Sequence, residues 1–166
     1  MRKLWRTPGG TAAAVCLDML KQPHLLIAGS TGSGKSVLIN SLIYTALYKS
    51  PNRCQFILID PKRVELIDYK PLPHTISYSS EIPDILEALQ YSIDLMENRY
   101  KLMQRQRIKK STAANIYIII DEYADLVIQA KKQVERYIIR LSQLGRAANI
   151  HLIIATQRPT RDIVTG

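Results

Sequence analysis

The sequence contains little cysteine and no long apolar run. Its two cysteines, Cys16 and Cys54, are too few for a disulfide framework and lack the spacing of a zinc site, which suits a reducing, cytoplasmic setting. The three histidines lie apart from any cysteine or carboxylate cluster, so we expect no zinc site. No apolar stretch approaches the roughly 20 residues of a membrane-spanning helix. The basic start "MRKLWRTPGG" lacks the apolar segment of a signal peptide. We therefore expect no direct membrane contact from this segment.

Acidic residues are also scarce. The chain has 14 Asp and Glu against 23 Lys and Arg, for a net charge of +9 and an isoelectric point near 9.7. Such an excess indicates a polyanionic partner, and it favours nucleic acid over an anionic membrane surface or ordinary solubility charge. A length of 166 residues is enough for one domain with a core and too short for two ordinary domains.

Short apolar runs alternate with helical stretches along the chain. The runs "HLLIA" (24–28), "QFILI" (55–59), "IYIII" (116–120) and "HLIIA" (151–155) are continuous rather than alternating, which is typical of parallel strands buried on both faces. The pattern predicts an α/β fold with a parallel sheet flanked by helices. Residues 61–79 contain Pro61, Pro71 and Pro73, and we interpret them as a loop.

Three helices are predicted between these strands. The first runs from about Lys35 to Tyr48, and a long second one begins after Ser80 with Pro83 in its first turn. A third runs from about Lys131 to Leu144 and ends at Gly145. The core face of the second helix is predicted from apolar residues at spacings of three and four: Ile85, Leu89, Ile93, Met96, Tyr100 and Met103.

The stretch "GSTGSGKS" fits the phosphate-binding pattern G-x-x-x-x-G-K-[ST]. Its glycines let successive backbone N–H groups point at phosphate oxygens, helped by the positive end of the following helix. We expect Lys35 to reach the β- and γ-phosphates and the Ser36 hydroxyl to bind Mg²⁺. The motif follows a strand and opens a helix, as that geometry requires. The expected nucleotide-binding residues are Gly29, Ser30, Thr31, Gly32, Ser33, Gly34, Lys35 and Ser36.

Two adjacent acids end the strand "IYIII". Open α/β sheets bind ligands at the carboxyl ends of their strands, so Asp121 is a candidate to hold the metal through its water shell. Glu122 is then a candidate general base that polarises the attacking water. The alternative is that the two acids only cap the next helix.

The last apolar run ends in Thr156 and Gln157. If this strand lies between the strand of the phosphate loop and the strand of Asp121, Gln157 faces the γ-phosphate and can sense it. The alternative, which we leave open here, is that Gln157 satisfies backbone groups of the following turn.

The sequence resembles the FtsK/SpoIIIE family of DNA-translocating ATPases. The resemblance rests on five ordered blocks: "PHLLIAGSTGSGKSVLINSLI", "ILIDPKRVEL", "NRYKLM", "IIIDEYADL" and "GRAANIHLIIATQRPTRDIVTG". It implies a RecA-like motor core that forms a homo-hexamer and uses ATP to move double-stranded DNA. We expect residues 1–166 to be a single such domain, truncated at both ends relative to the family and lacking its last strand or strands.

The resemblance also implies a role for Arg146. It matches an arginine of the family's last block and follows Gly145, so it is a candidate arginine finger that reaches a neighbouring subunit's nucleotide. Arg158 is a reserve candidate. The alternative for Arg146 is an intrachain ion pair or an interaction with the helix end.

Two basic ladders have helical spacing and are candidate DNA contacts. One comprises Lys101, Arg105 and Lys109, with Arg99, Arg107 and Lys110 nearby, and the other comprises Lys132, Arg136 and Arg140. Residues four apart share a helix face and can follow phosphates without reading bases, although such ladders are often only solvated faces.

Three functions fit this sequence. The first is an ATP-dependent DNA translocase core. The second is a coupling or secretion ATPase that moves protein or nucleoprotein, and the third is a nucleotide-binding assembly module that does not hydrolyse ATP. The chain has no N-K-x-D motif for guanine, which disfavours a GTPase.

Overall fold

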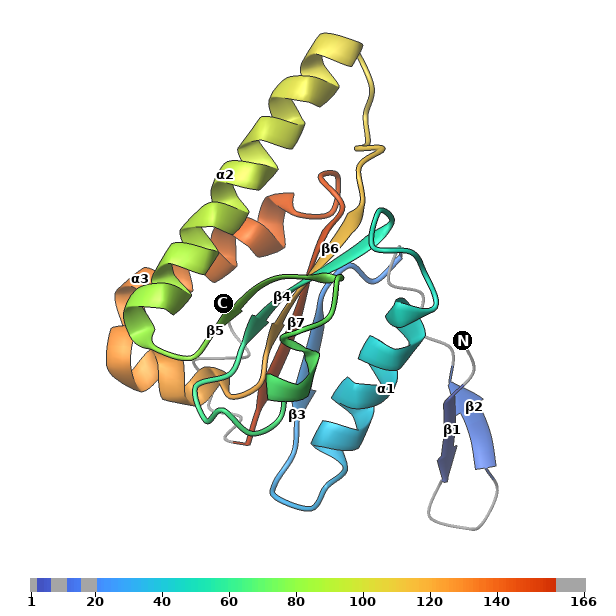
Figure 1. The fold of residues 1–166 in the computed structure, drawn as a ribbon, viewed down its shortest axis with the longest axis vertical. Coiled ribbons are helices and arrows are strands. Elements are labelled where there is room, and N and C mark those ends of the chain that lie inside the picture. The colour runs from blue at the N-terminus through green and yellow to red at the C-terminus, as the bar shows by residue number, and fades with distance from the viewer. Residues whose placement is uncertain (1–2, 7–11, 16–20, 158–166) are drawn as a thin grey trace.

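The structure, a computed structural model, describes residues 3–6, 12–15 and 21–157. In that part of the chain, one sheet of five parallel strands has the order β3-β7-β6-β4-β5 (Figure 1). Its strands are β3 (Leu25–Ala28), β4 (Cys54–Ile59), β5 (Thr75–Ser79), β6 (Asn115–Ile120) and β7 (Ile150–Thr156). The helices are α1 (Lys35–Leu47), α2 (Ile82–Gln106) and α3 (Tyr123–Leu144), with a short 3-10 helix, η1 (Ile67–Tyr69). Strands β1 (Lys3–Arg6) and β2 (Ala12–Val15) pair antiparallel with each other.

The sheet separates two apolar cores because side chains alternate between its faces. On β4, Phe56 and Leu58 pack with the α1 residues Ile39 and Ile43, whereas Ile57 and Ile59 pack with α2 and α3. Figure 1 shows this arrangement, with α1 on one side of the sheet and α2 and α3 on the other. Covering both faces explains why the strands are continuously apolar in sequence.

The four predicted strands are confirmed, each within a residue or two of its expected bounds. β7 lies between β3 and β6, as the interpretation of Gln157 required. The first two predicted helices are also confirmed, and the expected core residues of α2 are buried except Tyr100, which is partly buried.

The prediction of a continuous loop over residues 61–79 is wrong. The segment contains η1 and the edge strand β5, which pairs with β4. Prolines at 71 and 73 precede β5 rather than interrupt it, so they do not prevent its backbone from pairing.

The third helix begins at Tyr123, eight residues before the predicted start at 131. Ala130 has non-helical dihedrals (φ −146°, ψ 41°), so a kink divides α3 into two parts. The sequence pattern predicted only the second part. Leu126 in the first part is fully buried, and tertiary packing therefore stabilises this turn.

The first basic ladder is only partly helical. α2 ends at Gln106, and Arg107 adopts a left-handed conformation (φ 54°), so Lys109 lies beyond the helix and does not continue the ladder of Lys101 and Arg105. Arg99, named with this ladder, is buried. Its guanidinium donates hydrogen bonds to the carbonyl oxygens of Ala148 (2.6 Å) and Asn149 (3.3 Å). It ties α2 to the turn before β7 and is not available to DNA.

Among the described residues, no helix combines the length and apolar composition that crossing a membrane requires.

Arg99 gives a stability prediction. Arg99→Ala removes the charged donor from two buried carbonyl groups, so we expect the free energy of unfolding to fall by about 2–3 kcal/mol. The matched control Arg105→Ala, at an exposed position of the same helix, should change it by less than about 0.5 kcal/mol. Urea unfolding followed by circular dichroism measures both values. Equal effects would show that the two arginines do not differ in structural role.

Candidate nucleotide site

The phosphate loop connects the carboxyl end of β3 to the first turn of α1. Gly34 is the N-cap of α1 with φ 88°, a left-handed conformation that glycine adopts without strain. A Cβ atom on Gly29 would lie 2.3 Å from the Ser33 hydroxyl oxygen and 3.1 Å from the Ser33 Cβ atom, so the Ser33 side chain would have to move. The backbone conformation at Gly34 therefore favours glycine, and the contact with Ser33 leaves little room for a side chain at Gly29.

The loop also leaves the amino end of α1 available to an anion. Gly34 supplies no side-chain cap, and the first turn of the helix contains no acidic residue. The loop positions from Ser30 to Gly34 are exposed. Helix N-termini with uncapped N–H groups attract phosphate through their hydrogen bonds and their positive dipole end.

Lys35 and Asp121 form a buried ion pair between α1 and the end of β6. The Lys35 ammonium donates to the Asp121 carboxylate at 2.7 Å and to its carbonyl oxygen at 2.8 Å. Burial raises the pKa of Asp121, and the hydrogen bond and charge of Lys35 oppose that rise. The structure thus brings together the two residues from the separate sequence motifs.

Glu122 lies beside this pair and accepts two hydrogen bonds from the carboxyl end of β7. Its Oε1 accepts from the Thr156 hydroxyl and from the Gln157 backbone N–H, both at 3.0 Å. Its Oε2 lies 3.2 Å from the Lys62 ammonium. Burial acts to raise the pKa of Glu122, but these hydrogen bonds and the Lys62 charge outweigh it, so the pKa is lowered. Glu122 is therefore an ionised carboxylate at neutral pH.

The capping interpretation of Glu122 is wrong. Glu122 occupies the N-cap position of α3, but its side chain makes no capping hydrogen bond to that helix. Its carboxylate instead contacts Thr156 at the carboxyl end of β7 and Lys62 in the loop after β4.

Gln157 lies against the phosphate loop, where the strand order predicts it. The Thr31 hydroxyl donates to the Gln157 side-chain oxygen at 3.4 Å, while the Gln157 backbone N–H bonds to Glu122. Gln157 therefore bridges the loop and the acid, which fits a residue that responds to the γ-phosphate.

The structure places near this site two acidic residues, one directly after β4 and one further along the same loop, to which the sequence pattern assigned no role. Glu65 accepts a hydrogen bond of 2.7 Å from the Ser36 hydroxyl, the expected magnesium ligand. Asp60 is fully buried and accepts from the Leu66 N–H at 3.0 Å, which holds this loop in place. In the sequence, only their position in the block "ILIDPKRVEL" distinguishes these residues. The hydrogen bond between Glu65 and Ser36 joins positions 29 apart, so spacing along the chain does not predict it.

The oxygen ligands fit magnesium bound together with a nucleotide. Ser36, Asp121 and Glu65 offer hydroxyl and carboxylate oxygens, which Mg²⁺ prefers. Among the described residues, no group of three or more His, Cys, Asp or Glu side chains forms a metal cage. Mg²⁺ is commonly held by one or two protein oxygens plus substrate phosphates, and this site offers that mode.

Other predicted site residues lie elsewhere. Arg146 is exposed in the turn before β7, at the amino edge of the sheet, whereas the phosphate loop lies at the carboxyl edge. Within one chain it does not join the nucleotide site. Arg158 lies outside the described residues. The ladder of Lys132, Arg136 and Arg140 is exposed on α3.

Comparison with known proteins agrees with this geometry. The chain matches the family model described as FtsK/SpoIIIE family over residues 3–118 and 111–161. It is 41% identical over 169 residues to DNA translocase FtsK of Borreliella burgdorferi, covering 92% of this chain and 22% of that protein. It is 46% identical over 164 residues to DNA translocase FtsK of Caldanaerobacter subterraneus subsp. tengcongensis, covering 92% of this chain and 23% of that protein. The chain thus spans less than a quarter of these curated relatives.

Solved structures share the fold. One is the pCW3 conjugation coupling protein TcpA in a monomer form with ATPgS. It is 26% identical with a TM-score of 0.82, covering 100% of this chain and 50% of that chain. Another is Thermomonospora curvata EccC (ATPases 2 and 3) in complex with a signal sequence peptide. It is 27% identical with a TM-score of 0.71, covering 87% of this chain and 27% of that chain.

The contact between Lys62 and Glu122 gives a pH prediction. Lys62→Met removes a cation that lowers the pKa of Glu122, so that pKa should rise. A lowered carboxyl pKa stabilises the folded state above the unfolded-state pKa, and this contribution is lost as the pH falls through the folded-state pKa. The variant should therefore lose stability at neutral pH, by roughly 1 kcal/mol or less because Lys62 is partly exposed.

Carbon-detected NMR titration of the Glu122 carboxyl group measures this pKa directly. Lys62→Arg keeps the cation and is the matched control, so its pKa should stay close to that of the wild type. An identical Glu122 pKa in the wild type and Lys62→Met would contradict the assigned electrostatic contact.

Proposed function

This chain belongs to the FtsK/SpoIIIE family, and on that premise we propose that it forms the ATP-hydrolysing core of a motor that moves double-stranded DNA. The observation that carries the proposal is the meeting of two motifs at one sheet edge. Lys35 of the phosphate loop lies 2.7 Å from Asp121, and Glu122 adjoins them. This arrangement supports the proposal because ATP hydrolysis requires a phosphate cradle, an acid that binds the metal and a general base, and these residues are candidates for each role.

The nucleotide phosphates would bind the loop from Gly29 to Ser36. We propose that Lys35 then donates to phosphate oxygens instead of Asp121, which leaves the Asp121 carboxylate and the Ser36 hydroxyl to hold Mg²⁺. The ion supplies positive charge that stabilises the transferring phosphoryl group. Glu65 would orient the Ser36 hydroxyl through the hydrogen bond between them.

Glu122 is the proposed general base. Its carboxylate is ionised and held by Thr156 and Gln157, so it can accept a proton from the water that attacks the γ-phosphorus. The bond between the γ-phosphorus and the β–γ bridging oxygen breaks, and ADP and phosphate result. Gln157 contacts both the loop and Glu122, and we propose that it couples the presence of the γ-phosphate to the base.

Arg146 enters this proposal only through assembly. It lies at the opposite edge of the sheet from the loop of its own chain, so a finger role requires the nucleotide of a neighbouring subunit. We propose a homo-hexamer of single RecA-like domains on the basis of the family, with Arg146 reaching across the subunit boundary.

A second candidate function is a coupling or secretion ATPase. It is favoured by the likeness to the conjugation coupling protein TcpA and to EccC, which was solved with a signal sequence peptide. Comparing duplex DNA, single-stranded DNA and a signal peptide as stimulators of ATP hydrolysis separates the two. We expect the largest stimulation from duplex DNA, and stimulation by the peptide alone would favour the secretion role.

Lys35→Ala tests the phosphate loop. Without the ammonium group that would bind the β- and γ-phosphates, ATP turnover should fall to background. The variant also leaves buried Asp121 without its partner, so circular dichroism must first show that it is folded. Lys21→Ala, an exposed position before β3, is the control and should retain turnover. Turnover by a folded Lys35→Ala variant at the wild-type rate would remove the loop from the mechanism.

Glu122→Gln separates binding from hydrolysis. The amide keeps the size of the side chain but accepts no proton, so kcat should fall by about 10²- to 10⁴-fold while ATP stays bound. A fluorescent ATP analogue measures affinity, and phosphate release measures turnover. Glu135→Gln on α3 is the control and should leave both unchanged. Retained turnover would dismiss the base assignment, and tight binding without turnover in the wild type would favour a non-hydrolysing assembly module.

A further inference from the structure

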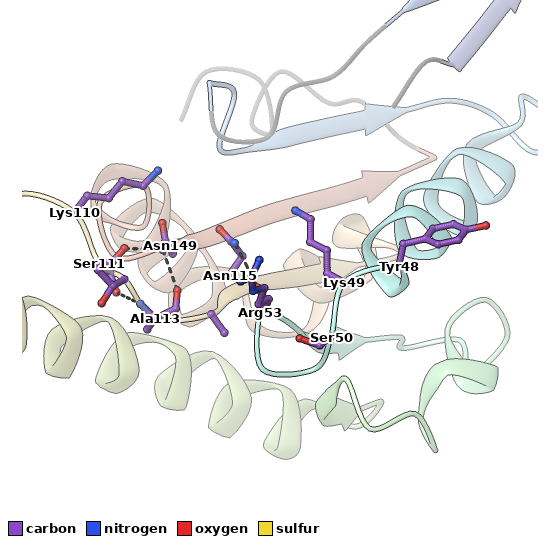
Figure 2. Close-up of a pocket in the computed structure, with 11 residues that line it drawn as sticks. Tyr48, Lys49, Ser50, Arg53, Lys110, Ser111, Ala113, Asn115 and Asn149 are labelled. Carbon is purple, nitrogen blue, oxygen red and sulfur yellow. Dashed lines mark hydrogen bonds between the residues drawn. The ribbon is translucent and has the colours of Figure 1, made fainter.

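A cleft lies at the amino edge of the sheet, away from the phosphate loop. This cleft has a volume of about 860 Å³ and is lined by two segments that are far apart in sequence. One is the turn between α1 and β4, with Tyr48, Lys49, Ser50 and Arg53. The other is the connection from α2 into β6, residues 110–115, and Asn149 completes the lining. Figure 2 shows these side chains around the cleft.

The cleft is positively charged and contains no acid. Its lining includes Lys49, Arg53 and Lys110 but no Asp or Glu. Neither segment supplies one nearby, because residues 19–59 and 98–120 contain no acidic residue at all. Among the described residues, none of the three cations forms an ion pair. Three uncompensated cations in one concavity produce a local field that attracts anions.

Both walls of the cleft are held by hydrogen bonds. The Asn149 side-chain amide donates to the carbonyl oxygens of Ser111 (2.9 Å) and Ala113 (3.0 Å), which fixes the segment that carries Lys110. On the other wall, a His74 ring nitrogen lies 2.8 Å from the Lys49 carbonyl oxygen. The Asn115 backbone N–H bonds to the Arg53 carbonyl oxygen at 3.0 Å and joins the two walls. The cations are therefore attached to an ordered backbone rather than to an unanchored loop.

The interior behind the cleft adds no charge of its own. His151 lies behind Asn115, whose side-chain oxygen is 3.1 Å from a His151 ring nitrogen. Burial lowers the pKa of His151 to about 4, although its hydrogen bond with the Pro23 carbonyl oxygen opposes that shift. At neutral pH this histidine is therefore uncharged.

The basic ladder on α3 compares poorly with this cleft. Arg140 is ion-paired with Glu97 of α2, and the groove beside Lys132 and Arg136 also contains Glu135. Acids beside the ladder would repel a phosphate backbone, and they already neutralise part of the positive charge of the ladder. The described lining of the amino-edge cleft contains no acid that would act in this way.

We propose that the cleft formed by Lys49, Arg53 and Lys110 is a docking site for the phosphodiester backbone of duplex DNA, an inference that rests on the proposed translocase function. Lysine, arginine, hydroxyl and amide groups are the side chains that contact phosphate oxygens. The lining offers Ser50, Ser111, Thr112 and Asn115 beside its cations. Such contacts are independent of base sequence, as a motor that travels along DNA requires. Because the cleft and the phosphate loop occupy opposite sheet edges, DNA and nucleotide bind without competing.

Fluorescence anisotropy of a labelled 30-base-pair duplex over a range of salt concentrations tests this site. The full chain is compared with the variant Lys49→Ala/Arg53→Ala/Lys110→Ala. The matched control Lys101→Ala/Arg105→Ala/Lys132→Ala removes the same charge from the exposed ladders of α2 and α3. We expect the cleft variant to lose at least about tenfold in affinity, and its log–log salt slope to fall by about 2 to 3. The ladder variant should change affinity by less than about threefold.

Further measurements separate the possible failures. Basal ATP turnover should be unchanged in both triple variants, and millimolar ATP should not displace the duplex. Equal losses in the two variants, or none in the cleft variant, would overturn the cleft while leaving the translocase proposal standing. A wild-type chain that binds no duplex at all would remove both. Displacement of the duplex by an equal concentration of single-stranded DNA or polyglutamate would assign the cleft to a different polyanion.

Discussion

The buried pair of Lys35 and Asp121 is the interaction on which the nucleotide site depends. Its two members come from positions 86 apart in sequence, and they meet because β3, β7 and β6 run parallel and end at the same edge. If β6 ran antiparallel to β3, Asp121 would lie at the edge of the sheet opposite Lys35. The pair also accounts for the polar groups around it, since a charge buried at this depth is tolerated only with a partner and with saturated hydrogen bonds. Glu122 follows the same rule through Thr156, Gln157 and Lys62.

The two edges of the sheet carry opposite chemistry. Asp60, Glu65, Asp121 and Glu122 gather at the carboxyl edge, where strand ends and the amino end of α1 suit phosphate and metal. Lys49, Arg53 and Lys110 gather at the amino edge without acids. The two edges of one sheet thus keep the proposed nucleotide site and the proposed DNA-docking cleft apart. In the proposed function, this separation would let nucleotide and DNA bind at the same time.

Several features of the site followed from local pattern, and others did not. The phosphate loop, Asp121 and the position of Gln157 were predictable because each depends on residues adjacent in sequence and on the rule that parallel strands end together. Glu65, Lys62 and the loss of Arg99 from the basic ladder were not, because each depends on a partner brought close by folding. β5 was missed because nearby prolines resemble a loop signal, and the first part of α3 because burial of Leu126, rather than local propensity, stabilises it.

By itself, the sequence determined the fold class and the chemistry of the phosphate loop. Apolar runs specify buried strands, and glycines with Lys35 and Ser36 specify a phosphate cradle through backbone geometry that is local to the loop. Only the tertiary structure decided which charges are paired and which remain available. Pairing depends on distances of a few ångströms between segments far apart in the chain, which spacing along the sequence does not encode. For that reason only the structure shows that the Glu122 side chain does not cap α3 and that Arg99 is buried. It also shows that, within the described part of the chain, the cations of the amino edge form no ion pair.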